Sequence, residues 1–333
     1  MDVHITKLSK NGKLYQVIQE FNTEKGYMGA DRISSTDMGY IFEDLVKRFS
    51  ESYNEDAGAH FTSRDIIYLM TDVLLSTDKA TLESDGVAKS IYDQTMGTSQ
   101  MLTAMQERLT LLDRDAEVAL YGQELNPKTY AIAKADMLIR GGNPDNMQLG
   151  NTLTDDRFAG FNFDYCISNP PFGIDWKSDY DTVKKEHDRG EAGRFVPGLP
   201  KRSDGQLLFM LNGLSKLKET GRMAIIHNGS SLFSGAAGSG ESEIRRYVLE
   251  NDWLESIIQL PNDVFYNTGI TTYIWVFDKD KETHRKGKVQ LIDASNMYES
   301  RRKNIGSKRV DITEECRNVL VQAYGEFRTR NTD

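Results

Sequence analysis

From about residue 88 onward, short apolar runs alternate with segments of helical pattern, and this alternation limits the folds open to the chain. Strands that alternate with helices indicate a mainly parallel sheet with helices on both faces. The last two apolar runs have no helix between them, so we expect one of these two strands to be antiparallel. The expected strands are 90–93, 119–123, 163–168, 222–228, 254–261 and 271–278, and the expected helices are 99–112, one starting at Pro127, 205–219, 241–249 and 313–327.

The remaining segments have different patterns. Before residue 56 the pattern is helical, and Ser35 or Thr36 can cap a helix over 36–50 with an apolar stripe. We therefore predict a helical segment over 1–56 and one α/β domain over 57–330. The stretch 175–202 has no apolar periodicity and predicts a long loop, which in a compact domain is usually functional. A flexible loop is expected over 234–243.

Composition narrows the class of protein. No run approaches the ~18 apolar residues of a membrane-spanning helix, and the first residues lack the apolar core of a signal peptide, so we expect a cytoplasmic protein. Cys166 and Cys316 are isolated, which favours neither a disulfide framework nor a zinc site. The net charge of −9 argues against a basic coat for nucleic acid. The exception lies between His284 and Arg309, where eight basic residues stand against two acidic ones.

The residues Asn169-Pro170-Pro171-Phe172 follow directly on the expected strand 163–168. Proline fixes φ and has no N–H, so two prolines make a stiff corner, although the pair also suits a plain turn. The Asn169 side-chain carbonyl and the Pro170 backbone carbonyl are neighbouring acceptors that suit an NH₂ group. Phe172 adds a flat face on which a heterocycle can stack. The motif predicts a site that binds an aromatic amine and aims its lone pair at an electrophile.

With this motif and six others in the same order, the sequence resembles the γ-type N6-adenine DNA methyltransferases, most closely the modification subunits of type I restriction-modification systems. The resemblance runs from about residue 36 to 327. It implies a Rossmann-like S-adenosylmethionine-dependent methyltransferase fold, with a mostly parallel sheet, one antiparallel strand and a short N-terminal helical segment. The motifs are GAHFTSRDII (58–67), YDQTMGTSQML (92–102), LYGQELNPKTYAIAKADMLIRG (120–141), GNTLTDDRF (150–158), FDYCISNPPFG (163–173), GRMAIIHNGSSLF (221–233) and LPNDVFYNTGITTYIWVF (260–277).

The resemblance implies S-adenosylmethionine as the cofactor and no metal. Glu124 would hold the ribose hydroxyls, and a helix starting near Ser99 would direct its N–H groups at the methionine carboxylate. The glycine-rich loop departs from the family pattern, because Gln94 stands where proline is usual and only Gly97 remains of its glycines. The implied cofactor-binding residues are His60, Phe61, Thr62, Ser63, Arg64, Asp93, Gly97, Thr98, Ser99, Gln100, Glu124 and Asn151.

The reaction that the resemblance implies is methyl transfer from S-adenosylmethionine to N6 of an adenine flipped out of duplex DNA. The implied catalytic residues are Asn169, Pro170, Pro171 and Phe172. Two alternatives stay open at this point. One is N5-methylation of a protein glutamine, which the same corner serves, and the other is a non-catalytic DNA-associated scaffold with the same fold.

Partners follow from what the sequence does not contain. After the Asn-Pro-Pro-Phe strand there is no extra domain of ~100 residues that reads bases in a groove. The resemblance therefore implies duplex DNA, a specificity subunit, a restriction (endonuclease/translocase) subunit and a second copy of the chain as partners. Helices 36–50 and 313–327 are candidate interfaces. We expect the basic residues of 284–309 and 175–202 to face phosphates.

Overall fold

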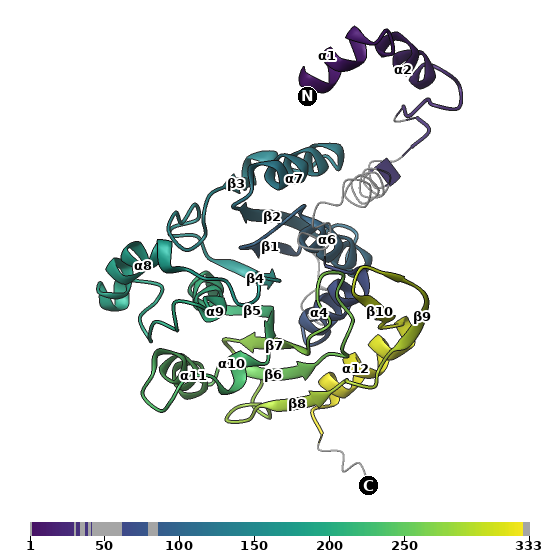
Figure 1. Cartoon of the computed structure of the whole chain (residues 1–333). Helices are drawn as coiled ribbons and strands as arrows, with labels where there is room; N and C mark the ends of the chain where they lie inside the picture. Colours follow the sequence, from purple (N-terminus) through teal and green to yellow (C-terminus); the bar gives the residue numbers. More distant parts are fainter. Residues whose placement is uncertain are drawn as a thin grey trace.

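The computed structural model describes residues 2–29, 31–33, 37–38, 41, 62–78 and 86–328. Within these residues the chain is an α/β structure built on one large sheet (Figure 1). Most of the predicted helix 36–50, and the predicted boundary near residue 56, lie outside the described residues. The described α-helices are α1 (Asp2–Lys10), α2 (Leu14–Phe21), α4 (Arg64–Ser76), α6 (Gln100–Leu112), α7 (Pro127–Ile139), α8 (Tyr180–His187), α9 (Gln206–Ser215), α10 (Ser230–Phe233), α11 (Gly240–Glu250) and α12 (Glu314–Glu326).

The large sheet has the strand order β3-β2-β1-β4-β5-β7-β6-β8. Strand β7 runs antiparallel to β5 and β6, and the other neighbours pair in parallel. This confirms the expected parallel sheet with one antiparallel strand. Two further strands form a separate hairpin. The strands are β1 (Ala88–Asp93), β2 (Glu117–Glu124), β3 (Met147–Leu149), β4 (Phe163–Ser168), β5 (Leu217–Asn228), β6 (Leu254–Gln259), β7 (Thr272–Asp278), β8 (Gln290–Asp293), β9 (Glu299–Ile305) and β10 (Lys308–Asp311).

Helices cover both faces of the sheet because successive residues of its central strands point to opposite sides. In β5, Ala224 and Ile226 pack in the core under α4, α6 and α12, whereas Met223 and Ile225 pack in the core under α9 and α11. Strand β7 alternates in the same way. Apolar residues are therefore continuous along these strands, as expected for strands buried on both sides.

The stretch 175–202 is not the long loop that its composition predicted. It contains α8 and the two short 3₁₀ turns η3 (Lys177–Asp179) and η4 (Gly190–Ala192). Three fully buried apolar side chains, Trp176, Val183 and Phe195, attach the segment to the core beside α9. These anchors are too widely spaced among charged residues to give a recognisable periodicity.

Two element boundaries were also wrong. The helix predicted over 205–219 ends at Ser215, and β5 begins at Leu217 rather than at residue 222, since Leu217 pairs with Phe163 at the start of β4. The loop predicted over 234–243 ends early because the Ser239 hydroxyl accepts a hydrogen bond from the Ser242 N–H and caps α11. No helix of the described residues is long and apolar enough to cross a membrane.

Candidate active site

Four of the predicted site residues lie at the carboxyl ends of four neighbouring strands. Asp93 ends β1, Glu124 ends β2, Asn151 follows β3 by two residues, and Asn169 follows β4. The chain goes from β1 outward to β2 and β3, then returns to place β4 on the other side of β1. Strand order therefore reverses between β1 and β4, which is where open α/β sheets bind ligands.

The loop after β1 turns sharply under the end of β2. Gly97 and Ser99 both have positive φ, +55° and +70°, so the backbone turns twice through the left-handed region. The Gly97 N–H donates to Glu124 Oε2 at 3.0 Å, and the Met96 N–H donates to the Gln123 carbonyl at 3.0 Å. A Cβ on Gly122 would lie 2.3 Å from the Met96 sulfur and 3.0 Å from the Met96 Cβ, so a larger residue here would displace the Met96 side chain of this loop.

The two departures from the family's loop pattern have their own hydrogen bonds. Ser99 adopts a conformation that favours glycine, and its hydroxyl donates to Asp136 Oδ2 at 3.2 Å. Gln94 is fully buried and its Oε1 accepts from Asn212 Nδ2 on α9 at 2.7 Å. The Gln94 carbonyl accepts from the Thr152 hydroxyl at 2.6 Å. Side-chain hydrogen bonds thus fix the loop where proline and glycine are usual in the family.

Asp93 is a buried acid with an open acceptor. It is 0% exposed, its Oδ1 accepts from the Thr95 N–H at 3.0 Å, and its Oδ2 has no hydrogen-bond partner among the described residues. Burial raises the pKa of Asp93 to about 7; the Thr95 hydrogen bond opposes this rise and the Glu124 carboxylate adds to it. A cation placed at Oδ2 would stabilise the charged form.

Glu124 is half-buried, and each of its oxygens accepts one backbone N–H, from Asn126 at 2.7 Å and from Gly97 at 3.0 Å. Carboxylate oxygens are acceptors of the kind that suits the hydroxyls of a ribose. Helix α6 begins beside this acid at Gln100, and Ser99 forms no side-chain capping bond to it. Thr98, just before it, is 7% exposed, and its hydroxyl lacks a partner in the described structure.

The Asn169-Pro170-Pro171-Phe172 corner presents one open acceptor. Asn169 Nδ2 donates to the Thr62 hydroxyl at 2.9 Å, while the buried Asn169 Oδ1 has no partner among the residues described. Pro170 is buried and Pro171 is exposed. Phe172 is half-buried and packs edge-to-face on Phe265, with ring centroids 6.0 Å apart. The structure therefore brings Thr62, predicted as a cofactor residue, against the predicted catalytic asparagine.

The other described site residues form hydrogen bonds with neighbouring segments of the protein. Ser63 is buried, donates to Asp65 and accepts from Lys308 Nζ at 3.3 Å, and Arg64 donates to the Tyr68 hydroxyl at 3.0 Å. Asn151 donates to Asp179 at 3.1 Å and accepts from the Leu153 N–H at 3.0 Å, so its amide contacts the α8 segment. His60 and Phe61 lie outside the described residues.

Several residues at this edge of the sheet had no predicted role. Asn212 and Asp136 support the loop after β1, and Phe265 supports Phe172. At the end of β5, Gln206 Nε2 donates to Asn228 Oδ1 at 2.8 Å and to Asp204 Oδ2 at 2.9 Å. Most of these contacts join segments far apart in the sequence. Asp136, Asn228 and Phe265 lie in the quoted motifs, but the motifs do not indicate these contacts.

The basic residues predicted to face phosphates divide into two groups. Arg285 and Lys308 are each 1% exposed; Arg285 lies 3.3 Å from Glu255 and Lys308 lies 2.9 Å from Asp65, so neither faces solvent. Arg194, from the stretch 175–202, forms an ion pair with Glu186 at 2.6 Å, with 9% of its side chain exposed. For these three the prediction was wrong, because each cation is used inside the fold. Arg302, Lys303 and Arg309 are exposed.

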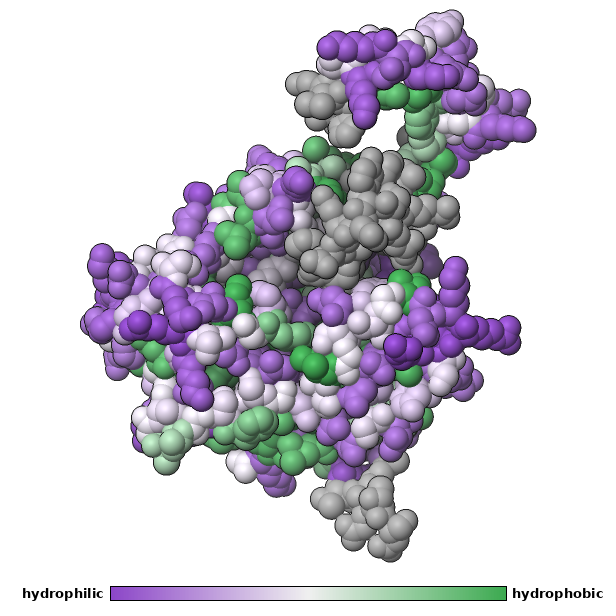
Figure 2. All heavy atoms as spheres, viewed as in Figure 1, coloured by the Kyte–Doolittle hydropathy of each residue, from purple (hydrophilic) through white to green (hydrophobic). Residues whose placement is uncertain are grey.

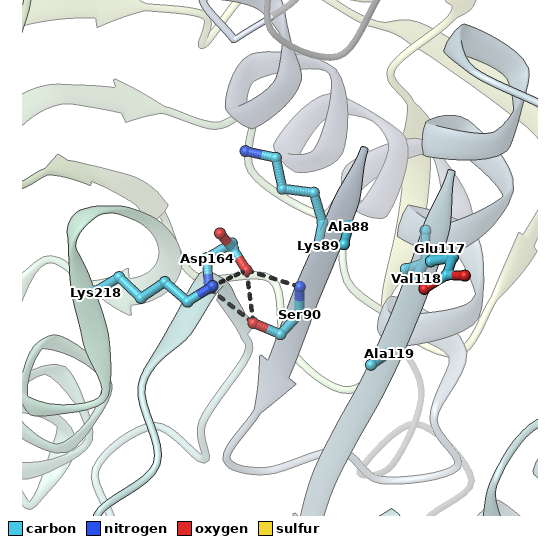
Figure 3. A pocket seen from close by; sticks show the side chains of 8 residues that line it. All are labelled: Ala88, Lys89, Ser90, Glu117, Val118, Ala119, Asp164 and Lys218. Atoms are coloured by element: carbon cyan, nitrogen blue, oxygen red, sulfur yellow. Dashed lines mark hydrogen bonds and ion pairs between the residues drawn. The ribbon is translucent and has the colours of Figure 1, made fainter. Parts of the chain in front are cut away.

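A pocket of about 420 Å³ lies at the opposite, amino-terminal edge of the sheet (Figure 3). The carboxylate in this pocket is already paired, because Asp164 Oδ2 accepts from the Ser90 hydroxyl at 2.7 Å and from Lys218 Nζ at 2.7 Å. Among the described residues there is no group of three or more His, Cys, Asp or Glu that could hold a metal ion. The carboxyl edge remains the better candidate because its acceptors lack partners.

Known proteins share both the sequence and the fold. A family model described as N-6 DNA Methylase matches residues 34–332. The MjaIX methylase subunit of a type I restriction enzyme from Methanocaldococcus jannaschii is 29% identical over 292 residues, which cover 87% of this chain and 49% of that protein. The chain thus spans about half the length of the curated relatives it matches.

Two solved structures show the same architecture. The methyltransferase subunit of a type I restriction-modification system from Streptococcus thermophilus has a TM-score of 0.74 and 26% identity, over 91% of this chain and 60% of that one. A class I S-adenosylmethionine-dependent methyltransferase of Listeria monocytogenes has a TM-score of 0.70 and 16% identity, over 96% and 86% of the two chains, and supports the fold alone. The predicted methyltransferase fold is confirmed, and the chain belongs to the N-6 DNA methylase family.

Proposed function

We propose that this chain methylates N6 of adenine in duplex DNA, as the modification subunit of a type I restriction-modification complex. The observation that carries the proposal is the open acceptor Asn169 Oδ1, held next to Pro170 at the end of β4. An adenine amine placed there would donate to Asn169 Oδ1 and to the Pro170 carbonyl. Both hydrogen bonds favour a pyramidal nitrogen with its lone pair directed away from the corner.

S-adenosylmethionine supplies an electrophilic methyl group when bound. The residues of the neighbouring strand ends fit such a cofactor. Asp93 Oδ2 is a buried acceptor suited to a positive charge, the Glu124 carboxylate is the type of group that binds ribose hydroxyls, and α6 starts where a carboxylate would meet its first N–H groups. Asp93 ends β1, and the Asn169-Pro170-Pro171-Phe172 corner, which we call the amine corner, follows β4. These two strands are neighbours in the sheet, so the cofactor and the adenine meet at the same edge.

The assignment of the base depends on Phe172. A flipped adenine needs a flat apolar surface in exchange for the base stacking that it loses. Phe172 is half-buried and braced by Phe265. We infer that one face of the adenine packs on this side chain. The curated relatives are named as methylase subunits of restriction enzymes, which supports DNA rather than a protein glutamine as the substrate.

The partners of the proposed complex are a specificity subunit, a restriction subunit and a second copy of this chain. No base-reading domain follows the Asn-Pro-Pro-Phe corner within the described residues, where the sheet, the β9–β10 hairpin and α12 account for the chain up to residue 326. In the proposed complex the specificity subunit reads the DNA sequence.

The test is methyl transfer from tritiated S-adenosylmethionine, measured separately for DNA and for protein. The chain reconstituted with its specificity subunit should label DNA, and Asn169→Ala should abolish the label while leaving calorimetric binding of S-adenosylmethionine nearly unchanged. Label in protein instead of DNA would support the glutamine alternative. Absence of saturable cofactor binding would support the scaffold. Full activity of Asn169→Ala would refute the assigned site.

A further inference from the structure

The hairpin of β9 and β10 concentrates positive charge on an acidic chain. Residues 299–311 contain five basic and two acidic residues, a net charge of +3 against −9 for the whole chain. In Figure 1 the hairpin lies beside α12, and Figure 2 shows strongly hydrophilic side chains projecting in the same region. The hairpin is therefore a local site of attraction for anions.

Two of the five cations are neutralised inside the protein. Lys308 Nζ lies 2.9 Å from Asp65 and 3.2 Å from Asp311, and Arg301 donates to the same Asp311 at 2.6 Å. The other three are Arg302, Lys303 and Arg309, which we call the free cations. They are exposed, and their side chains form no hydrogen bond or ion pair with any described residue.

The hairpin is fastened to both sides of the amine corner. Lys308 Nζ donates to Ser63 Oγ at 3.3 Å and to the Val264 carbonyl at 3.1 Å. Ser63 is next in sequence to Thr62, the partner of Asn169, and Val264 is next to Phe265, the partner of Phe172. The buried lysine therefore ties the hairpin to the two residues that support the corner.

The turn of the hairpin is hydrogen-bonded to the segment 263–266. The Ser307 N–H donates to the Tyr266 carbonyl at 2.8 Å and the Arg309 N–H donates to the Asp263 carbonyl at 2.8 Å. Gly306 has a φ of +56°, and a Cβ there would lie 2.3 Å from the Tyr266 carbonyl oxygen. These bonds hold the turn and Arg309 next to the active site, and Arg302 and Lys303 lie on β9, where its pairing with β10 is irregular.

We propose that the free cations of the β9–β10 hairpin bind phosphates of the DNA backbone that flank the flipped adenine, an inference that rests on the function proposed above. Phosphate contacts supply most of the sequence-independent affinity for DNA and set the position of the duplex. A flipped base exposes its own backbone to the enzyme, so cations mounted beside the base corner meet the phosphates next to it. Lys308 positions the hairpin and does not contact DNA.

The experiment replaces the free cations together, as Arg302→Ala/Lys303→Ala/Arg309→Ala. Binding of the chain, reconstituted with its specificity subunit, to a fluorescein-labelled duplex is measured by anisotropy over a series of KCl concentrations. Each phosphate contact adds about 0.9 to the slope of log affinity against log salt, so the triple variant should lower that slope by about 2 to 3. Affinity at low salt should fall by at least about tenfold. Charge-preserving Arg302→Lys/Lys303→Arg/Arg309→Lys should keep the wild-type slope.

A matched control removes three cations at the amino-terminal edge, as Arg114→Ala/Lys286→Ala/Lys288→Ala. These residues are exposed and lie at the edge of the sheet opposite the site. The control should keep the slope. Binding of S-adenosylmethionine should be the same in all variants, which reports that each is folded. A wild-type slope in the hairpin triple variant would overturn the proposal. The proposal would also be overturned if this variant lost binding of the specificity subunit while its salt slope stayed unchanged. Either result leaves the proposed methylation intact if wild-type DNA labelling persists.

Discussion

At the scale of single residues, the hydrogen bond from Asn169 to Thr62 decides which end of the amide faces the site. Because Nδ2 donates to the Thr62 hydroxyl, Oδ1 is the end of the amide that has no partner among the described residues and can accept from the substrate amine. Thr62→Val keeps the shape but removes the acceptor, so the amide loses its preferred orientation. We expect kcat to fall about tenfold, the equivalent of one hydrogen bond, with little change in the Kd of S-adenosylmethionine. Thr62→Ser should retain activity, and an unchanged kcat in Thr62→Val would contradict this role.

Asp93 makes cofactor binding depend on pH. Its ordinary pKa of 3.8 is raised to about 7 in the folded chain, mainly by burial, so near neutral pH a large fraction is protonated. A positively charged ligand at Oδ2 favours the carboxylate. Affinity for S-adenosylmethionine should therefore rise about tenfold per pH unit below about pH 7 and level off above it. Calorimetric titrations of Asp93→Asn should show weaker binding without this rise, and an equal slope in the variant would contradict the assignment.

The same shift has the opposite sign for the stability of the chain without cofactor. A raised acid pKa means that the folded state holds its proton more tightly than the unfolded state does. The contribution of Asp93 to the free energy of unfolding should therefore be largest below about pH 4, and it is lost as the pH rises through about 7. Relative to wild type, Asp93→Asn should gain stability as the pH increases across this window. Thermal unfolding over a pH series measures the difference.

At the scale of elements, Arg194 holds the α8 segment against the site. Its guanidinium pairs with Glu186 and donates to the Thr152 carbonyl at 2.7 Å, and the Thr152 hydroxyl bonds to Gln94 in the loop after β1. Arg194→Met leaves the largely buried Glu186 carboxylate unpaired and should lower the free energy of unfolding by about 2–4 kcal/mol. Lys184→Ala, which removes an exposed pair with Asp188 in the same segment, is the control and should unfold like wild type. Equal unfolding of both variants would contradict the role of Arg194.

The sequence predicted well those elements whose pattern is local. Strand β4 was predicted residue for residue, since the mostly apolar run FDYCIS stops at Asn169-Pro170. Asp93, Glu124 and Asn169 were placed at strand ends for the same reason. Strand β9 was not predicted, because its sequence, ESRRKNI, is polar and its residues are mostly exposed, and pairing with β10 alone makes it a strand. The long-range partners Thr62 with Asn169 and Gln94 with Asn212 depend on packing between segments 107 and 118 residues apart.

At the scale of the whole molecule, the net charge favours an assembly. The net charge of −9 opposes binding to DNA, and the free cations of one hairpin offset only part of it. The chain spans about half the length of its curated relatives. We expect the isolated chain to methylate DNA weakly or not at all, and addition of the specificity subunit to restore activity by at least about tenfold through positioning of the duplex. Filter-binding assays of methyl transfer with and without that subunit test this, and strong sequence-specific activity of the isolated chain would refute the dependence.

The central claim concerns which atom receives the methyl group, so the most direct measurement maps modified bases in a host that expresses the whole system. With the wild-type chain, N6-methyladenine should appear in genomic DNA at one sequence context. With Asn169→Ala it should be absent, although the variant still binds S-adenosylmethionine. Persistence of the mark in the variant, or its absence with the wild-type chain, would contradict the account.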